Sequence, residues 1–203
     1  MTLKTVNTIL MSLYGSNVGA GKKSLDIGCA IGLSLISAQQ FGFEAHGIEP
    51  QFYEAQYARD HLKLNVQNVL FRSTLFEDNS FDFILLNQVL EHVINPKDFL
   101  GDVIKILKPG GILFLSVPPV DWLRLKLSKF ANSQFKKLDI FYDPDDHVNY
   151  FYLKGIKILV EKNRGISMAY TISTKSNSLS IAFSILLLVR ILSKNRLLAK
   201  FKH

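Results

Sequence analysis

The sequence predicts an α/β protein with a doubly wound, mostly parallel sheet, helices on both of its faces, and a basic apolar helix at the C-terminus. Two observations support the sheet. Short apolar runs alternate with helical patterns over residues 24–117, and a glycine-containing turn follows the first run. The run at 81–87, FDFILLN, has almost no polar face, which is typical of a strand that helices cover on both sides.

The expected elements follow one another at the spacing of βαβ units with right-handed crossovers. Gly42 ends the first helix, as a glycine just past a helix end often does. Pro109-Gly110-Gly111 separates the last helix of the series from the fifth strand. This order predicts a Rossmann-like sheet. We expect strands at 24–28, 45–49, 69–72, 81–87 and 112–117, and helices at 33–41, from Pro50 through 59–64, and at 95–107.

The pattern changes after Pro119. Residues 120–150 mix aromatic, aliphatic and basic residues without a clean period, and we interpret them as a lid. A helix is expected at 151–163, a strand at 166–173, and a strongly apolar, basic helix at 178–201. The expected organisation is therefore one domain over residues 1–176 and a C-terminal helix over 177–203.

Charge is unevenly distributed along the chain. The net charge is +7, yet eight basic residues and no acidic one follow Glu161, so the body is nearly neutral. A basic apolar helix of this kind is typical of an element that lies in a membrane interface and contacts anionic lipid. Packing on the body or self-association is the alternative. Nucleic-acid binding over the whole protein is disfavoured.

The single cysteine, Cys29, rules out an internal disulfide framework and is consistent with a reducing compartment. The N-terminal residues lack the pattern of a secretory signal and favour a first helix. We therefore expect the protein in the cytoplasm, with peripheral membrane contact as a further possibility through the C-terminal helix.

A nucleoside site is predicted at the carboxyl ends of the first two strands, where open parallel sheets bind ligands. The first strand ends in Asp26-Ile27-Gly28 and continues through a turn to Gly32, and the second ends in Glu49, whose carboxylate can accept two ribose hydroxyls. The dinucleotide pattern G-x-G-x-x-G fails because Ala30 and Leu33 replace its later glycines. A cationic, phosphate-free nucleoside such as S-adenosylmethionine fits this site better.

Four segments, in order and at the usual spacings, resemble class I S-adenosylmethionine-dependent methyltransferases of the small-molecule and glycan type. They cover roughly residues 24–165 and read LDIGCAIGLSLISAQQFGFEAHGIEP, DNSFDFILLNQVLEHVINP, LKPGGILFLSVP and HVNYFYLKGIKILVEKNRG. Many nucleic-acid amino methyltransferases carry Asn/Asp-Pro-Pro-aromatic after the fourth strand. Asn87-Gln88-Val89-Leu90 stands there instead, so nucleic acid is a disfavoured acceptor.

The resemblance implies S-adenosylmethionine as the cofactor and assigns a role to each matching residue. Gly28 and Gly32 approach the amino-acid portion of the cofactor, Asp26 orients their loop or the amino group, and Glu49 holds the ribose. Cys29 lies in the same loop and is counted among the cofactor-binding residues; we expect its thiol to be a small packing group and not a nucleophile.

The remaining contacts implied by the resemblance come from later segments. Asn87 and Gln88 lie by the amino-acid portion and the methyl group, and Thr74 and Leu75 lie at the adenine. The family often ends in one more, antiparallel strand. No strand pattern is evident after Ser178, so we expect that strand to be missing and the sheet edge to be open or covered by the tail.

Catalysis of methyl transfer chiefly requires alignment of the acceptor and exclusion of water. His147, beside the carboxylates of DPDDH, is the candidate general base for a hydroxyl acceptor, and the alternative is that it anchors the lid. No metal site is expected. Glu91-His92, after the fourth strand, either cap a loop or form part of the site wall.

The sequence thus predicts an S-adenosylmethionine-dependent methyltransferase that methylates an oxygen of a small molecule, lipid or glycan. Two alternatives remain: a protein that binds S-adenosylmethionine without turnover, and a nucleotide-cofactor oxidoreductase. Neither the acceptor nor the oligomeric state follows from the sequence.

Overall fold

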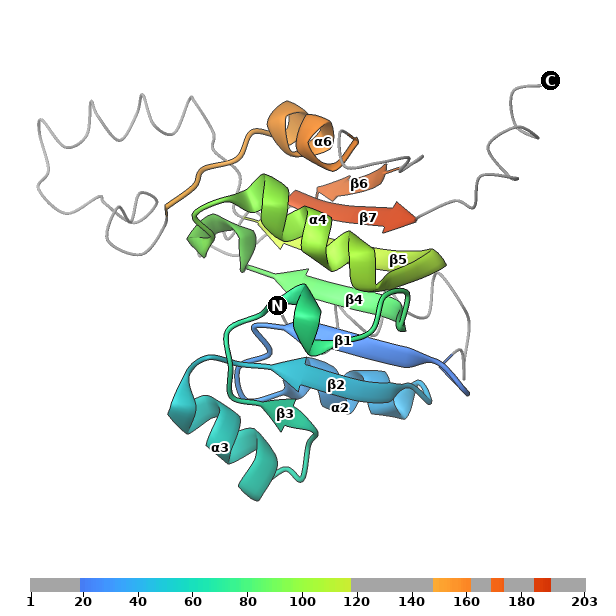
Figure 1. The fold of residues 1–203 in the computed structure, drawn as a ribbon, viewed down its shortest axis with the longest axis vertical. Coiled ribbons are helices and arrows are strands. Elements are labelled where there is room, and N and C mark those ends of the chain that lie inside the picture. The colour runs from blue at the N-terminus through green and yellow to red at the C-terminus, as the bar shows by residue number, and fades with distance from the viewer. Residues whose placement is uncertain (1–18, 118–147, 162–168, 174–184, 191–203) are drawn as a thin grey trace, which may run out of the picture.

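The computed structural model describes residues 19–117, 148–161, 169–173 and 185–190 (Figure 1). Its centre is a seven-stranded sheet in the order β3-β2-β1-β4-β5-β7-β6. The strands are β1 (Lys23–Ile27), β2 (Glu44–Ile48), β3 (Val66–Gln67), β4 (Phe81–Asn87), β5 (Leu107–Val117), β6 (Ala169–Ser173) and β7 (Ile185–Arg190).

The first five strands are parallel, and their order reverses between β1 and β4. The chain runs outward from β1 to β2 and β3, then crosses back to place β4 on the other side of β1. In doubly wound sheets, ligands bind above the carboxyl ends of the strands at the point where the strand order reverses, which here lies between β1 and β4. The predicted doubly wound, mostly parallel sheet is confirmed.

Helices cover both faces of the sheet because β4 and β5 present apolar side chains on each side. Phe83, Leu85 and Phe114 belong to one apolar cluster, and Ile84, Leu86, Leu113 and Leu115 belong to the other. The first cluster includes residues of α2 (Leu33–Gln40) and α3 (Phe52–Asp60), and the second includes residues of α4 (Pro96–Ile106) and α6 (Leu153–Glu161). The strand FDFILLN thus lacks a polar face because helices cover it on both sides, as expected.

The prediction that the last strand is missing is wrong. Residues 185–190, expected within the C-terminal helix, form β7, which pairs antiparallel with both β5 and β6. A continuous apolar run such as ILLLV lacks the alternation of a half-exposed strand, so its pattern does not distinguish a helix from a strand buried on both faces. The edge of β5 is therefore paired with β7. The rest of 177–203 lies outside the described residues.

Smaller differences concern the ends of elements. The third strand lies at Val66–Gln67 and not at 69–72, and Val69 and Leu70 are exposed. β5 begins at Leu107, directly after α4, so Pro109 and the two glycines that follow lie within the strand. The helix expected at 151–163 and the strand expected at 166–173 are confirmed as α6 and β6. The expected N-terminal helix and most of the 120–150 lid lie outside the described residues.

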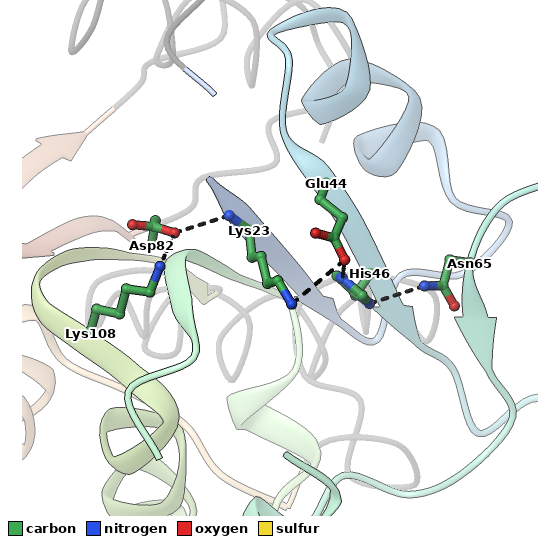
Figure 2. A network of polar contacts seen from close by, with 6 residues as sticks. All are labelled: Lys23, Glu44, His46, Asn65, Asp82 and Lys108. Atoms are coloured by element: carbon green, nitrogen blue, oxygen red, sulfur yellow. Dashed lines mark hydrogen bonds and ion pairs between the residues drawn. The ribbon is translucent and has the colours of Figure 1, made fainter. Parts of the chain in front are cut away.

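Polar contacts connect neighbouring strands near their amino ends (Figure 2). Asp82 of β4 accepts hydrogen bonds from the backbone nitrogen of Lys23 at 3.0 Å and from Lys108 Nζ at 2.7 Å. Glu44 Oε1 lies 3.7 Å from Lys23 Nζ and 2.9 Å from His46 Nε2. Asn65 Nδ2, just before β3, lies 3.0 Å from His46 Nδ1. These contacts connect β1, β2, β4 and β5 at the end of the sheet opposite the carboxyl ends of the parallel strands.

Leu115→Ala tests the central place of β5. Leu115 is fully buried, so the substitution should lower the free energy of unfolding by about 2–5 kcal/mol through lost burial and a residual cavity. Leu70→Ala is the matched control, because Leu70 is 70% exposed and its truncation should change stability by at most about 0.5 kcal/mol. Urea unfolding measures both; equal losses would contradict the assigned core.

Candidate functional site

The turn between β1 and α2 has an unusual backbone. Three of its five residues have positive φ: 76° at Gly28, 49° at Ala30 and 85° at Gly32. The amides of Gly28 and Cys29 donate to the carbonyl of Ile48, at 2.8 and 3.1 Å, which ties the turn to β2. Glycine adopts this conformation at little cost, whereas an alanine pays about 1–2 kcal/mol. Ala30 therefore needs a partner that holds it there.

Glu49 is that partner. Its buried carboxylate, directly after β2, accepts a hydrogen bond from the Ala30 amide at 2.8 Å through Oε2 and from the Gln51 amide at 2.7 Å through Oε1. Asn68 Nδ2 donates to the carbonyls of Glu49 and Pro50, both at 2.9 Å, and so fixes the backbone that carries the carboxylate. A carboxylate offers about four acceptor positions, so two remain for the hydroxyl groups of a ligand.

Asp26 is the second buried carboxyl group of the site, and only 4% of it is exposed. Ser34 Oγ, in the first turn of α2, donates to Asp26 Oδ2, while Oδ1 is buried without a hydrogen-bond partner in the described part of the chain. Burial raises the pKa of Asp26 from 3.8 to about 7. The Ser34 hydrogen bond opposes this increase in pKa, and the Glu49 carboxylate adds to it.

Cys29 packs against β2. Its side chain is buried, and a Cβ atom added to Gly47 would lie 2.7 Å from Cys29 Sγ, so the thiol occupies the space that this glycine leaves. Burial raises the pKa of the Cys29 thiol, and the charges of Asp26 and Glu49 raise it further. A neutral thiol is a poor nucleophile. The contacts are those expected of a packing group.

Asn87 and Gln88 end β4 and lie beside β5. Asn87 is in register with Ser116, and Gln88 donates its amide to the Ser116 carbonyl at 2.9 Å and its side-chain Nε2 to Ser116 Oγ at 3.0 Å. Gln88 has a φ of 57°, so a second non-glycine residue of the site has a left-handed backbone. These two bonds hold Gln88 against β5, on the opposite side of β4 from the glycine turn.

Thr74 and Leu75 lie in the short helix η1 (Ser73–Leu75) after β3, and both are exposed. Ser73 Oγ donates to Asp102 Oδ1 of α4 at 2.8 Å and anchors this segment. The Thr74 and Leu75 side chains therefore remain accessible, as a contact with adenine would require.

The last residues of the 120–150 segment are attached to the loop after β4. The amides of Val148 and Asn149 both donate to the Glu91 carbonyl at 2.9 Å, and Asn149 Nδ2 donates to the Val93 carbonyl. Glu91 lies in η2 (Leu90–His92) and is fully buried. His147 lies outside the described residues, so its expected role as a base stays a prediction. Within the described ranges, no group of three or more His, Cys, Asp or Glu residues is arranged to hold a metal ion.

Several contacts of the site were missed by reasoning from the sequence. Ser34, Asn68 and Ser116 each fix a predicted site residue. Asn68 and Ser116 act on residues far from them in the chain, and no short-range pattern marks such a pair. Ser34 is the exception, because a serine in the first turn of a helix after a strand with an acidic residue is a recognisable signal.

A family model described as "Methyltransferase domain" matches residues 9–165. The chain belongs to this methyltransferase domain family. The resemblance to class I S-adenosylmethionine-dependent methyltransferases is confirmed.

Curated relatives of this methyltransferase domain act in quinone biosynthesis, according to their names. A ubiquinone biosynthesis O-methyltransferase of Nitrobacter winogradskyi is 29% identical over 154 residues, which are 70% of this chain and 59% of that protein. A demethylmenaquinone methyltransferase of Tropheryma whipplei is 38% identical over 100 residues, 47% of this chain and 41% of that protein. The chain thus spans about half the length of the curated relatives it matches.

Solved structures of methyltransferases share the fold. Magnesium protoporphyrin IX methyltransferase from Synechocystis, solved with S-adenosylhomocysteine bound, aligns with a TM-score of 0.68 at 18% identity over 94% of this chain and 82% of its own. A methyltransferase from Archaeoglobus fulgidus aligns with a TM-score of 0.65 at 14% identity over 93% of this chain and 94% of its own. These likenesses support the fold of the methyltransferase domain.

Glu49→Gln tests whether the carboxylate holds the turn. The amide group that replaces one oxygen faces a backbone N–H donor, so a buried donor loses its acceptor and the free energy of unfolding should fall by about 1–3 kcal/mol. Glu44→Gln, at the exposed start of the same strand, should change stability by at most about 0.5 kcal/mol. Guanidinium unfolding compares the two; a loss in both or in neither would remove this role from Glu49.

Proposed function

We propose that this chain binds S-adenosylmethionine above the carboxyl ends of β1, β2 and β4 and transfers its methyl group to an oxygen of a small molecule or lipid. The observation that carries the proposal is the buried Glu49 carboxylate, which faces the positive-φ turn and keeps two acceptor positions for a ribose diol.

The residues present fit a nucleoside that carries positive charge and no phosphate. Gly28 and Gly32 have positive φ, and a Cβ at Gly28 would come within 2.8 Å of Val89 Cγ2 and at Gly32 within 2.4 Å of Leu64 Cδ1, so the packing of the turn itself requires glycine at both positions. Two carboxyl groups, those of Asp26 and Glu49, lie beside the same turn. Negative charge at this point favours a sulfonium over a pyrophosphate.

S-adenosylmethionine supplies a methyl group that is already activated for in-line displacement. The protein's own residues would then bind the cofactor and orient it toward the acceptor. Glu49 would hold the ribose, the turn would receive the amino-acid portion, and Thr74 and Leu75 would border adenine. Asn87 and Gln88 would lie next to the reacting centre. Fixing both reactants in line and excluding water supplies the rate enhancement.

The acceptor is proposed from the relatives and from the surface beside β4. One relative is named as a ubiquinone biosynthesis O-methyltransferase and another as a demethylmenaquinone methyltransferase. Ile94, after β4, is 89% exposed, and Val148, on the attached segment, is 60% exposed. Val148 is attached through its amide to Glu91 in the loop after β4, so both exposed apolar groups belong to segments next to the end of this strand. Exposed apolar groups there favour an apolar, lipid-like acceptor. His147, next in the chain to Val148, is the proposed base for its hydroxyl proton.

Membrane contact was predicted for the basic, apolar residues at the C-terminus. No helix in the described ranges is long and apolar enough to cross a bilayer. Because 185–190 are paired in the sheet, the apolar surface expected for an interfacial helix is reduced. Contact with anionic lipid remains a prediction for the basic residues of the tail outside the described ranges.

Calorimetry with S-adenosylhomocysteine, NAD and NADP tests the cofactor. We expect S-adenosylhomocysteine to bind and the two dinucleotides to fail. Glu49→Gln should weaken binding by about tenfold to a hundredfold, the value of a hydrogen bond to a charged group, whereas Glu44→Gln should leave it unchanged.

Transfer of a radiolabelled methyl group into a cell extract then tests turnover. Label in the extracted lipid fraction supports the proposed acceptor class. Tight binding without any labelled product would instead favour a binding protein, and binding of NAD alone would overturn the cofactor assignment.

A further inference from the structure

The two buried carboxyl groups of the site have different surroundings. Both oxygens of Glu49 accept backbone amides, so its negative charge is stabilised where it lies. Asp26 has a single donor, Ser34, on Oδ2, and its Oδ1 is buried without a hydrogen-bond partner in the described part of the chain. An ionised carboxylate with an unsatisfied buried oxygen is costly, and a proton on that oxygen removes the charge.

None of the described elements packed around Asp26 supplies a hydrogen-bond donor to its Oδ1. α2 contributes the neutral Ser34 hydroxyl, the end of β2 contributes the Glu49 carboxylate, and the turn contributes the Cys29 thiol. The residues in register with Asp26 on the neighbouring strands, Gly47 and Leu85, carry no charge. No Lys or Arg of the described ranges is among the groups that shift the pKa of Asp26. Burial and Glu49 raise this pKa, the Ser34 hydrogen bond and the positive charge of the chain's amino terminus lower it, and the result is a pKa of about 7.

We propose that Asp26 carries a proton in the empty protein and releases it when a ligand with net positive charge binds at the turn, so that Asp26 favours S-adenosylmethionine over S-adenosylhomocysteine. The inference rests on the proposed function. The two ligands differ by one methyl group and one positive charge, since methyl loss leaves the sulfur electron pair on a neutral thioether. The proton passes to solvent on binding of the sulfonium and returns to Asp26 once the charge is lost.

Asp26 acts here as a positioning residue. Its Oδ1 is covered by protein atoms, so the ligand charge acts on it through the electrostatic field of a poorly solvated site, where an opposite charge within about 6 Å strongly favours the ionised carboxylate. The sign follows from this. Below pH 7 the sulfonium must displace a proton, whereas above pH 7 Asp26 is already ionised.

Titration calorimetry of the whole chain in buffers of different ionisation enthalpy counts the protons released. At pH 6, S-adenosylmethionine should release close to one proton and S-adenosylhomocysteine close to none. From pH 6 to pH 8 the affinity for S-adenosylmethionine should rise about tenfold, as follows from a pKa of about 7, while that for S-adenosylhomocysteine stays level.

Three variants separate Asp26 from other causes. Asp26→Asn should abolish the proton release and the pH dependence of the affinity ratio. Ser34→Ala should move the midpoint of that dependence to higher pH, because the lost hydrogen bond stabilises the ionised form. Asp82→Asn changes an aspartate near the amino end of β4, away from the site, and should leave the proton release and the pH dependence of the affinity ratio as in the wild type. The Ser34→Ala shift requires only that the variant folds and binds, so a misfolded Asp26→Asn protein does not end the test.

The failure of this inference differs from the failure of the proposed function. If neither ligand binds, the proposed function itself fails. If both bind with equal proton release, or with none, the assignment of charge discrimination to Asp26 is overturned while the cofactor assignment stands.

Discussion

The hydrogen bond from the Ala30 amide to Glu49 is the contact on which the candidate site depends. A left-handed alanine costs about 1–2 kcal/mol, and a hydrogen bond to a charged acceptor contributes about 1.5–3 kcal/mol, so this one bond is enough to hold the turn. Glu49 itself is held by Gln51 and Asn68. The acid at the end of β2 thus shapes the turn after β1 before any ligand arrives.

The amino ends and the carboxyl ends of the parallel strands carry charged residues in different surroundings. At the amino ends of the strands, Lys23, Asp82 and Lys108 pair with opposite charges at the surface, where each pair contributes little alone. At the carboxyl ends, Asp26 and Glu49 lie buried with few donors between them. At the amino ends each charge has an oppositely charged neighbour, whereas at the carboxyl ends Glu49 is stabilised by backbone amides and the charge of Asp26 depends on what binds beside it. This separation lets the fold keep a strained turn on a firmly connected sheet.

Most of the fold could be predicted from the sequence because its signals are local. The helix that begins at Pro96 has an amphipathic period, and the apolar run 81–87 is placed by its position in the series of alternating strands and helices; both are confirmed. β7 could not be predicted, since ILLLVR has no period and becomes a strand only because β5 and β6 are available on either side. Pairing of this kind depends on partners distant in the chain.

The candidate site divides in the same way. The ends of the first two strands are enough to predict four of the site residues: Asp26, Gly28, Gly32 and Glu49. The protonation state of Asp26 cannot be predicted from the sequence, because it depends on how many hydrogen-bond donors reach each carboxyl oxygen. Ser34 supplies one of these donors. The same holds for Gln88, whose orientation is set by Ser116. Residue type indicates where chemistry can occur, while the contacts of each atom decide which charge it carries.

The place of β7 has a consequence for biosynthesis. β5 is made long before its antiparallel neighbour leaves the ribosome, and until then one full side of the apolar segment ILFLSV has no pairing partner. An unpaired apolar strand edge is the template on which chains aggregate. A nascent chain of this protein therefore exposes an unpaired apolar strand edge until β7 has been made.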